Sequence, residues 1–367
     1  MTVVDSSSTA RRHSVVHRLR VAEVERLTAD AVAITFDVPP ELAADYAFAA
    51  GQHVNVARPG ETGDTRRSYS ICSPAGSGRL RIAVKRIPDG VFSAYALDTL
   101  AAGDEIDVMT PAGRFTPHLD PSRAGRHHAA IAAGSGITPV MSIIATVLAD
   151  EPDSRVTLLY GNRTANSAMF LDELADLKDT HAGRLQLVHV LSREPQSTDL
   201  LSGRIDAERL GDLLDALLPP ETVDEWYLCG PFELVESARF VLVERGADRA
   251  HVHAELFHVG DSPPARAAEV RAAALVCDVT AVLDGRRTDV TLDDPDETVL
   301  EAVLRTRNDA PFACKGGVCG TCRAKVLGGA VTMERNFALE DDEVAAGYVL
   351  TCQSHPVTPE LSLDYDA

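Results

Sequence analysis

Cysteine and basic residues are both scarce in this chain of 367 residues. Seven cysteines are too few for a disulfide scaffold. The 35 Lys and Arg are outnumbered by 55 Asp and Glu, which gives a formal charge of −20. A chain this acidic repels phosphate backbones and anionic lipid surfaces, so its charge excludes general nucleic-acid binding and favours partners with basic surfaces. Apolar residues at 45% and charged residues at 25% predict an ordinary globular protein of about two to three domains.

Export and membrane signals are lacking as well. No apolar segment follows Arg11 and Arg12, so we expect neither a signal peptide nor twin-arginine export. One uncharged run, residues 129–149, is as long as a membrane span. The glycine-containing turn in its middle, residues 134–139, is predicted to divide the run into a short buried strand and a helix. Together with the few grouped cysteines, this predicts a reduced, soluble, cytoplasmic protein without a membrane partner.

The sequence pattern changes along the chain. Residues 14–123 carry short alternating runs separated by Gly, Pro and Asp, which predicts an antiparallel β-barrel or sandwich. Residues 124–258 alternate apolar strand-like runs with helical stretches such as 168–178, which predicts a parallel sheet built from βαβ units. A linker with prolines, 259–273, leads to a small acidic module over 274–367.

Four cysteines are grouped near the C-terminal end with the spacing C-x4-C-x2-C and a distant fourth, namely Cys314, Cys319, Cys322 and Cys352. This is the plant-type spacing of a [2Fe–2S] cluster. Three thiolates must converge from one loop, and Gly316, Gly317 and Gly320 allow the backbone to wrap closely. Structural zinc is the alternative, but zinc sites usually show paired C-x2-C knuckles, and the second knuckle is missing. Cys277 is expected to be a small buried hydrophobe.

The predicted barrel contains four side chains that suit a flavin, namely Arg67, Ser68, Tyr69 and Ser70. An arginine can pair with phosphate, a tyrosine ring can pack on an isoalloxazine, and a serine hydroxyl can hydrogen-bond a ring atom. An ordinary barrel surface is the alternative for these four residues. A second segment precedes a predicted helix over 94–100, namely Gly90, Val91, Phe92 and Ser93. Helix N-termini bind phosphate, so a pyrophosphate held from both sides favours FAD over FMN.

Two glycine turns follow strands in the α/β half. The first turn consists of Gly134, Ser135, Gly136, Ile137, Thr138 and Pro139. It differs from the dinucleotide-binding motif G-x-G-x-x-G because Pro139 occupies the position of the third glycine. The second is Cys229, Gly230 and Pro231. Such turns at the carboxyl ends of parallel strands meet in one crevice, which predicts a nucleotide site; two ordinary βα turns are the alternative. No carboxylate or cysteine pattern accompanies His251, His253 and His258, so we expect no metal there.

Together these motifs resemble the ferredoxin–NADP reductase superfamily, in its form with a C-terminal plant-type ferredoxin domain of the β-grasp type. The resemblance spans roughly residues 15–365. The segments 160–163, 190–195 and 227–231 look most similar to the subgroup of reductases that serve phenylacetyl-CoA epoxidase. Reductases of steroid hydroxylases and of ring-hydroxylating dioxygenases share the same architecture.

The resemblance implies a role for each matched residue. Arg67, Tyr69 and Ser70 match the flavin motif, residues 90–93 the pyrophosphate turn, and residues 134–139 the nicotinamide-nucleotide turn. Four residues match positions beside the reacting rings and are expected to be catalytic, namely Ser70, Cys229, Glu255 and the aromatic Phe257. The four grouped cysteines match the cluster ligands.

The implied activity is electron transfer from NADPH through FAD and the [2Fe–2S] cluster to a partner oxygenase. Positioning of the cofactors is the main catalytic device, so no general base is predicted. A non-catalytic iron–sulfur redox sensor or binding module is the alternative of another class, against which the intact turn at 134–139 argues. The acidic run 340–343 is expected to dock on a basic oxygenase surface, with a merely solvated face as the alternative.

NADPH is expected rather than NADH because Ser192 and Arg193 follow the apolar strand 185–191. NADP-using members of the superfamily place such a Ser-Arg pair on the 2′-phosphate, and Arg163 after the previous strand would supply a second cation. Glu194 argues for NADH instead, since NADH-preferring relatives often carry an acidic residue in this region. A plain surface role is the alternative for Arg193.

Overall fold

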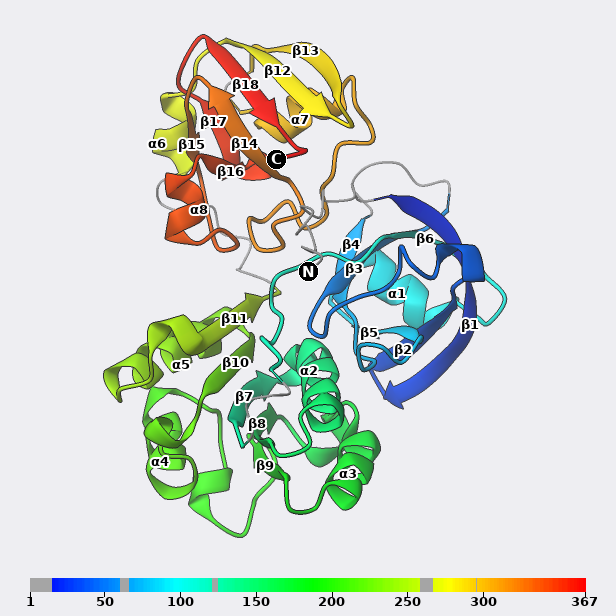
Figure 1. Cartoon of the computed structure of the whole chain (residues 1–367), viewed down its shortest axis with the longest axis vertical. Coiled ribbons are helices and arrows are strands. Elements are labelled where there is room, and N and C mark those ends of the chain that lie inside the picture. Colours follow the sequence, from blue (N-terminus) through cyan, green and yellow to red (C-terminus); the bar gives the residue numbers. More distant parts are fainter. Residues whose placement is uncertain (1–14, 60–65, 121–124, 258–266, 295) are drawn as a thin grey trace, which may run out of the picture. The chain divides into compact units, whose positions relative to one another are not determined.

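A computed structural model describes residues 15–59, 66–120, 125–257, 267–294 and 296–367 (Figure 1). Two compact units make up the described chain. One begins at Val16 and contains an antiparallel barrel and an α/β layer, and the other contains the C-terminal sheet. The predicted fold class is therefore confirmed.

Six antiparallel strands form the barrel in the order β4-β3-β6-β1-β2-β5. They are β1 (Val16–Thr28), β2 (Ala31–Asp37), β3 (His53–Ala57), β4 (Arg67–Ser70), β5 (Leu80–Lys85) and β6 (Glu105–Met109). A bridge between Ile71 and Ile82 joins the segment after β4 to β5, so the two edges of the sheet meet. Phe92 and Leu97 of helix α1 (Val91–Asp98) are buried in the barrel core.

Five parallel strands form the α/β layer in the order β11-β10-β7-β8-β9. They are β7 (His127–Ala133), β8 (Arg155–Asn162), β9 (Leu185–Leu191), β10 (Glu225–Gly230) and β11 (Val252–Leu256). Helices α2 (Ile137–Asp150) and α3 (Leu171–Thr180) pack in one core, and α4 (Ala207–Leu217) and α5 (Phe232–Glu244) pack in another. The α2 core includes Ala83 and Phe115 from the barrel side, so the barrel and the α/β layer share one hydrophobic core.

The C-terminal unit contains a mixed sheet in the order β13-β12-β18-β14-β16. Its strands are β12 (Cys277–Leu283), β13 (Arg286–Leu292), β14 (Arg323–Gly328), β16 (Tyr348–Leu350) and β18 (Glu360–Asp364). β12 and β18 run parallel, and the other pairs are antiparallel. Helix α7 (Val299–Leu304) begins with a Thr298–Glu301 capping box and buries Leu300 and Val303 in this core. A second small sheet and a helix complete the unit, namely β15 (Val331–Met333), β17 (Ser354–Pro356) and α8 (Asp341–Ala345).

Two helices begin at other residues than the sequence predicted, because the residue before each helix has a non-helical backbone conformation. α1 begins at Val91 rather than at residue 94, because extended Gly90 acts as its N-cap. α3 begins at Leu171 rather than at residue 168, because Phe170 before it is left-handed with φ 60°. The predicted linker 259–273 lies partly outside the described residues, and its described part contains α6 (Ala267–Ala272).

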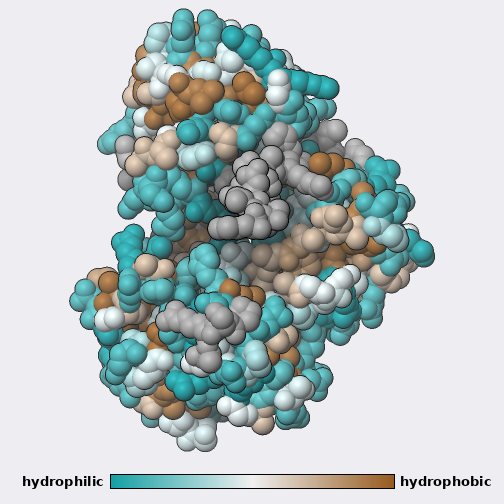
Figure 2. All heavy atoms as spheres, in the orientation of Figure 1, coloured by the Kyte–Doolittle hydropathy of each residue, from teal (hydrophilic) through white to brown (hydrophobic). Residues whose placement is uncertain are grey.

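The uncharged run at 129–149 is divided as predicted, between β7, a 3₁₀ turn at Gly134–Gly136, and α2. Across the described ranges, no helix is long and apolar enough to cross a membrane. Hydrophilic and hydrophobic side chains both lie on the visible face of each unit in Figure 2.

Candidate functional site

The end of strand β4 lies beside strand β11. Ser70, the last residue of β4, donates a hydrogen bond from Oγ to Oε2 of Glu255 over 3.2 Å. His53 is opposite Ser70 in the β3–β4 register, and its Nδ1 lies 3.9 Å from Oε1 of the same carboxyl group. Ser70 and His53 are buried, and the Glu255 side chain is 14% exposed. Two predicted catalytic residues therefore meet in space.

Strand β10 brings Cys229 to the same place. The parallel registers pair Cys229 with Glu255 on one side and with Ala132 on the other. The carbonyl of Cys229 also touches the first glycine turn, since a Cβ atom on Gly136 would lie 2.1 Å from that oxygen. Only glycine fits at this position. The two predicted turns are thus adjacent, as one crevice requires.

The rest of the first turn is ordered locally. Thr138 donates from Oγ1 to the carbonyl of Ser135 over 2.9 Å. Pro139 is buried in the first turn of α2, where its missing N–H costs little. Gly230 ends β10 in register with Leu256, the residue before exposed Phe257.

Burial sets the protonation states around Glu255. It raises the pKa of Glu255 to about 8, against the opposing effect of the Ser70 hydrogen bond. It lowers the pKa of His53 to about 4. It also raises the pKa of Cys229 well above its usual value, and the Glu255 charge adds to this shift. At about pH 7 the three groups are therefore predominantly neutral, which suits a surface for packing uncharged aromatic rings.

His53 escaped the sequence reasoning. Its Nε2 atom is buried and, among the described residues, has no hydrogen-bond partner. Its position in the sequence could have indicated a role, because His53 begins the strand that pairs with the predicted flavin motif.

The other residues of the flavin motif differ in surroundings. Arg67 is exposed, and Tyr69 is half-buried with its ring tilted against Phe92 at a centroid distance of 5.4 Å. Ser68 donates from Oγ to Oδ1 of Asn55 over 2.7 Å. The hydroxyl of Ser68 is thus engaged within the barrel, Tyr69 packs against the barrel core, and Arg67 lies at the surface end of the motif.

The second flavin segment forms a tight turn at the start of α1. Ser93 accepts from the N–H of Ile87 over 3.1 Å and donates to the carbonyl of Gly90 over 3.0 Å. Val91, in the first turn of the helix, is 56% exposed. The buried hydroxyl of Ser93 therefore holds this turn together, and beside it Gly90 is half-buried and Val91 is exposed.

The loops after β8 and β9 lie side by side. The N–H of Ser192 donates to the carbonyl of Asn162 over 2.9 Å, and the N–H of Arg193 donates to the carbonyl of Arg163 over 2.8 Å. The side chains of Arg163 and Arg193 are exposed. Glu194 accepts from the N–H of Ala165 over 2.9 Å, so its carboxylate joins the two loops.

The four grouped cysteines form two pairs in the C-terminal unit. Side-chain hydrogen bonds join Cys314 to Cys319 and Cys322 to Cys352. The bond with Cys319, opposed by burial and aided by backbone N–H donors, holds the pKa of Cys314 below its usual value. Among the described residues no three His, Cys, Asp or Glu side chains gather as a site for one ion. Two thiols for each iron match the donor set of a [2Fe–2S] cluster, and the residues fit that group.

The loop that carries three of these cysteines has the predicted close wrap. Its backbone is left-handed at Lys315, Gly317 and Gly320. The N–H of Gly316 donates to Sγ of Cys314 over 3.3 Å. Backbone donors aimed at sulfur favour thiolates, which are the form that binds iron.

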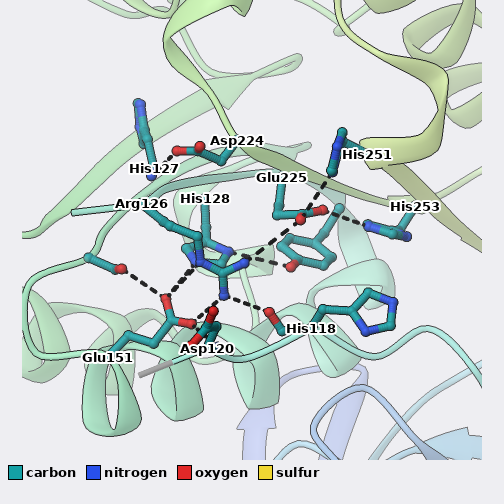
Figure 3. A network of polar contacts seen from close by, with 12 residues as sticks. His118, Asp120, Arg126, His127, His128, Glu151, Asp224, Glu225, His251 and His253 are labelled. Atoms are coloured by element: carbon teal, nitrogen blue, oxygen red, sulfur yellow. Dashed lines mark hydrogen bonds and ion pairs between the residues drawn. The ribbon is translucent and has the colours of Figure 1, made fainter. Parts of the chain in front are cut away.

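The histidines singled out in the sequence have a structural setting (Figure 3). His251 Nδ1 and His253 Nε2 lie 3.2 Å and 2.8 Å from the carboxylate of buried Glu225. The network continues to Arg126, which pairs with Glu151. These residues belong to the amino end of the parallel sheet, opposite the glycine turns. His258 lies outside the described residues.

Comparisons with known proteins agree with this arrangement. Three family models match the chain, an oxidoreductase FAD-binding domain over residues 18–116, an oxidoreductase NAD-binding domain over 130–239, and a 2Fe-2S iron-sulfur cluster binding domain over 281–357. The chain is 45% identical to a subunit of the 1,2-phenylacetyl-CoA epoxidase of Escherichia coli (strain K12), over 96% of this chain and 98% of that protein.

More distant relatives have the same span. The ferredoxin reductase component of 3-ketosteroid-9-alpha-monooxygenase from Rhodococcus rhodochrous is 34% identical over 95% of this chain and 96% of that protein. The solved structure of phthalate dioxygenase reductase, 26% identical, matches 95% of this chain and 98% of its own with a TM-score of 0.60. The chain therefore belongs to the ferredoxin–NADP reductase superfamily, as an NAD(P)H-dependent oxidoreductase with FAD-binding, NAD-binding and C-terminal 2Fe-2S domains.

Proposed function

We propose that the chain is the NADPH-dependent reductase component of phenylacetyl-CoA epoxidase. The 45% identical relative is named as a subunit of that enzyme and is matched over nearly its whole length. The single structural observation that carries the reductase function is the meeting of Ser70, Glu255 and Cys229 beside the nucleotide turn. The relative from a steroid monooxygenase makes a steroid hydroxylase the second candidate partner.

Bound FAD accepts an electron pair as hydride, and a [2Fe–2S] cluster releases electrons singly to a partner. The residues of this chain supply position and environment. Ser70 and neutral Glu255 offer hydroxyl and carboxyl groups at the reacting face. Cys229 and Gly136 pack together beside them, and we propose that exposed Phe257, which follows β11, covers the flavin.

The remaining cofactor contacts follow the sequence motifs. We propose that Arg67 and the N-terminus of α1 at Gly90 and Val91 hold the FAD pyrophosphate, with Tyr69 against the ring system. Residues 134–139 and Gly230 would receive the nucleotide. Cys314, Cys319, Cys322 and Cys352 would hold the cluster, with two thiolates on each iron.

The preference for NADPH is proposed from charge. Arg163 and Arg193 are exposed and adjacent through their backbones, and Ser192 lies beside them. Two cations and a hydroxyl suit a 2′-phosphate. Glu194 is hydrogen-bonded to the neighbouring loop, which supports a structural role for the one carboxylate that would favour NADH.

The predicted limits of the domains also stand as proposals: residues 14–123 for FAD, 124–258 for the nucleotide, 259–273 as a linker and 274–367 for the cluster. The proposed cluster needs its four cysteine ligands in the reduced form, which supports a reduced, cytoplasmic location.

A coupled assay tests the partner. The purified reductase would be combined with NADPH and either the phenylacetyl-CoA epoxidase oxygenase or a 3-ketosteroid hydroxylase oxygenase, and product formation would be measured per NADPH consumed. We expect coupled turnover with the epoxidase alone. Coupled turnover only with the steroid enzyme would replace the proposed partner but keep the reductase function.

A further inference from the structure

Two buried hydroxyls join the nucleotide-binding helix to the flavin-binding barrel. Ser142 on α2 donates from Oγ to the carbonyl of Ser73 over 2.7 Å. Thr146, one turn later on α2, accepts from the N–H of Ala75 over 2.9 Å. Ser142 and Thr146 are 0% and 1% exposed. Residues four apart share one helix face, so both bonds cross the same boundary between barrel and helix.

The barrel end of this link is close to the reacting face. Ser73 is three residues beyond Ser70, which limits the backbone path to about 10 Å. That path is held by hydrogen bonds from the N–H of Ile71 to the carbonyl of Gln52 and from the N–H of Cys72 to the carbonyl of Arg81, each 2.8 Å long. Ser73 is therefore held at a short, fixed separation from Ser70 within the barrel.

The helix end of the link is close to the nucleotide turn. Ser142 lies six residues after Gly136, a distance of about 9 Å along an α-helix. Thr146 also donates from Oγ1 to the backbone carbonyl of Ser142 over 2.7 Å, so its hydroxyl is held against the helix on the side that faces the barrel. α2 thus carries the nucleotide turn at one end and the barrel link in its middle.

We propose that Ser142 and Thr146 are positioning residues for hydride transfer, which fix the nucleotide turn relative to the flavin face. The inference rests on the proposed function and concerns no contact with either cofactor. Placement errors of about 1 Å can slow a reaction by about a hundredfold, so a short rigid link has a direct kinetic effect.

A separate clamp allows the link to be altered without separating the two layers. Buried Arg81 of β5 forms two hydrogen bonds of 2.9 Å with Glu173 of α3 and one of 2.7 Å with Glu25. The shared hydrophobic core also remains. Loss of one hydroxyl should therefore loosen the register of α2 while the fold persists.

The test compares Thr146→Val, which keeps the shape but loses the hydroxyl, with Thr146→Ser, which keeps the hydroxyl. Ser237→Ala is the control, because Ser237 on α5 donates to the carbonyl of Glu233 over 2.6 Å, and no hydrogen bond joins it to the described residues of the barrel. Stopped-flow absorbance would give the rate constant of flavin reduction by NADPH and the Kd for NADPH. Hydrogen exchange would report the Ala75 amide independently of activity.

For Thr146→Val we expect a reduction rate about tenfold lower, a Kd for NADPH within about twofold of wild type, and faster exchange in the peptide containing Ala75. Thr146→Ser and Ser237→Ala should match the wild type in all three. An unchanged reduction rate, an equal loss in Thr146→Ser, or a change confined to the Kd would each overturn the inference. If NADPH failed to reduce the wild-type flavin, the proposed function would fail, and unchanged exchange at Ala75 would separately overturn the link.

Discussion

Ser70 and Glu255 are 185 positions apart in the sequence, yet the Ser70 hydroxyl lies 3.2 Å from the Glu255 carboxylate. This bond joins the end of the barrel strand β4 to β11 at the edge of the parallel sheet. It places a buried carboxyl group of raised pKa where the flavin motif and the nucleotide turns converge.

Glu255 should make stability depend on pH. Burial raises its pKa from 4.5 in the unfolded chain to about 8 in the folded state, so the folded state binds the proton more tightly. Its stabilising contribution is complete below pH 4.5 and is lost as the pH rises towards 8, by up to about 1.4 kcal/mol per pH unit. Glu255→Gln should reduce the pH dependence of the free energy of unfolding between pH 4.5 and 8. Urea unfolding followed by the fluorescence of the single tryptophan, Trp226, would measure it. An equally steep profile in the variant would contradict the raised pKa.

Glu151 should stabilise the folded state with a pH dependence opposite to that of Glu255. Burial opposes ionisation of Glu151, but hydrogen bonds from Arg126, the Asp120 N–H and other donors lower its pKa to about 2. Its contribution is present above pH 4.5 and is lost as the pH falls towards 2.

Glu151→Gln removes the carboxylate that hydrogen-bonds buried Arg126 and leaves it the Glu225 carboxylate at 3.8 Å, which should cost up to about 3–5 kcal/mol of unfolding free energy at neutral pH. Thermal or urea unfolding measures this loss. Asp153→Asn, an exposed neighbouring acid, is the control and should change stability by less than about 0.5 kcal/mol. Equal effects of the two substitutions would show that the buried pair has no special role.

The cluster should be separable from the flavin chemistry. Cys314→Ser removes a proposed ligand and should abolish the iron absorbance and cytochrome c reduction. NADPH-dependent reduction of ferricyanide, which takes electrons directly from flavin, should persist. Loss of both activities alike would mean that the two units do not function separately.

Arg193 should select NADPH. A charge-assisted hydrogen bond contributes roughly 1.5–3 kcal/mol, which corresponds to a preference of about tenfold to hundredfold. Arg193→Ala should therefore raise the KM for NADPH by about that factor and leave the KM for NADH nearly unchanged. Arg249→Ala, another exposed arginine of this unit, is the control. A wild type that uses both nucleotides equally would refute the assignment.

Docking by charge should depend on three of the four acids in the run 340–343. Glu343 is buried and pairs with Arg323 over 3.0 Å, so it is unavailable to a partner, whereas Glu340, Asp341 and Asp342 are exposed. Replacing these three by their amides should slow oxygenase turnover at low salt and weaken its salt dependence. Glu360→Gln serves as the control, and wild-type turnover that does not vary with salt would exclude charge-guided docking.

The sequence was most informative where chemistry fixes spacing. The C-x4-C-x2-C run identified the grouped cysteines because three ligands on one loop leave few spacings. The glycine turn at 134–136 was predictable because glycines between an apolar strand and a helix mark a tight turn, and the structure adds that only glycine fits at 136 beside the Cys229 carbonyl. Phe170, Glu343 and His53 were not predictable in their roles, because a left-handed cap, a buried ion pair and a strand register depend on tertiary contacts.

Anaerobic titration with NADPH tests the central claim most directly, by following flavin absorbance and the electron paramagnetic resonance of the cluster in the wild-type protein. The account predicts an orange-brown protein whose flavin bleaches on addition of NADPH, followed by the signal of a reduced [2Fe–2S] cluster. A colourless protein, or a flavin and cluster that NADPH leaves oxidised, would contradict it.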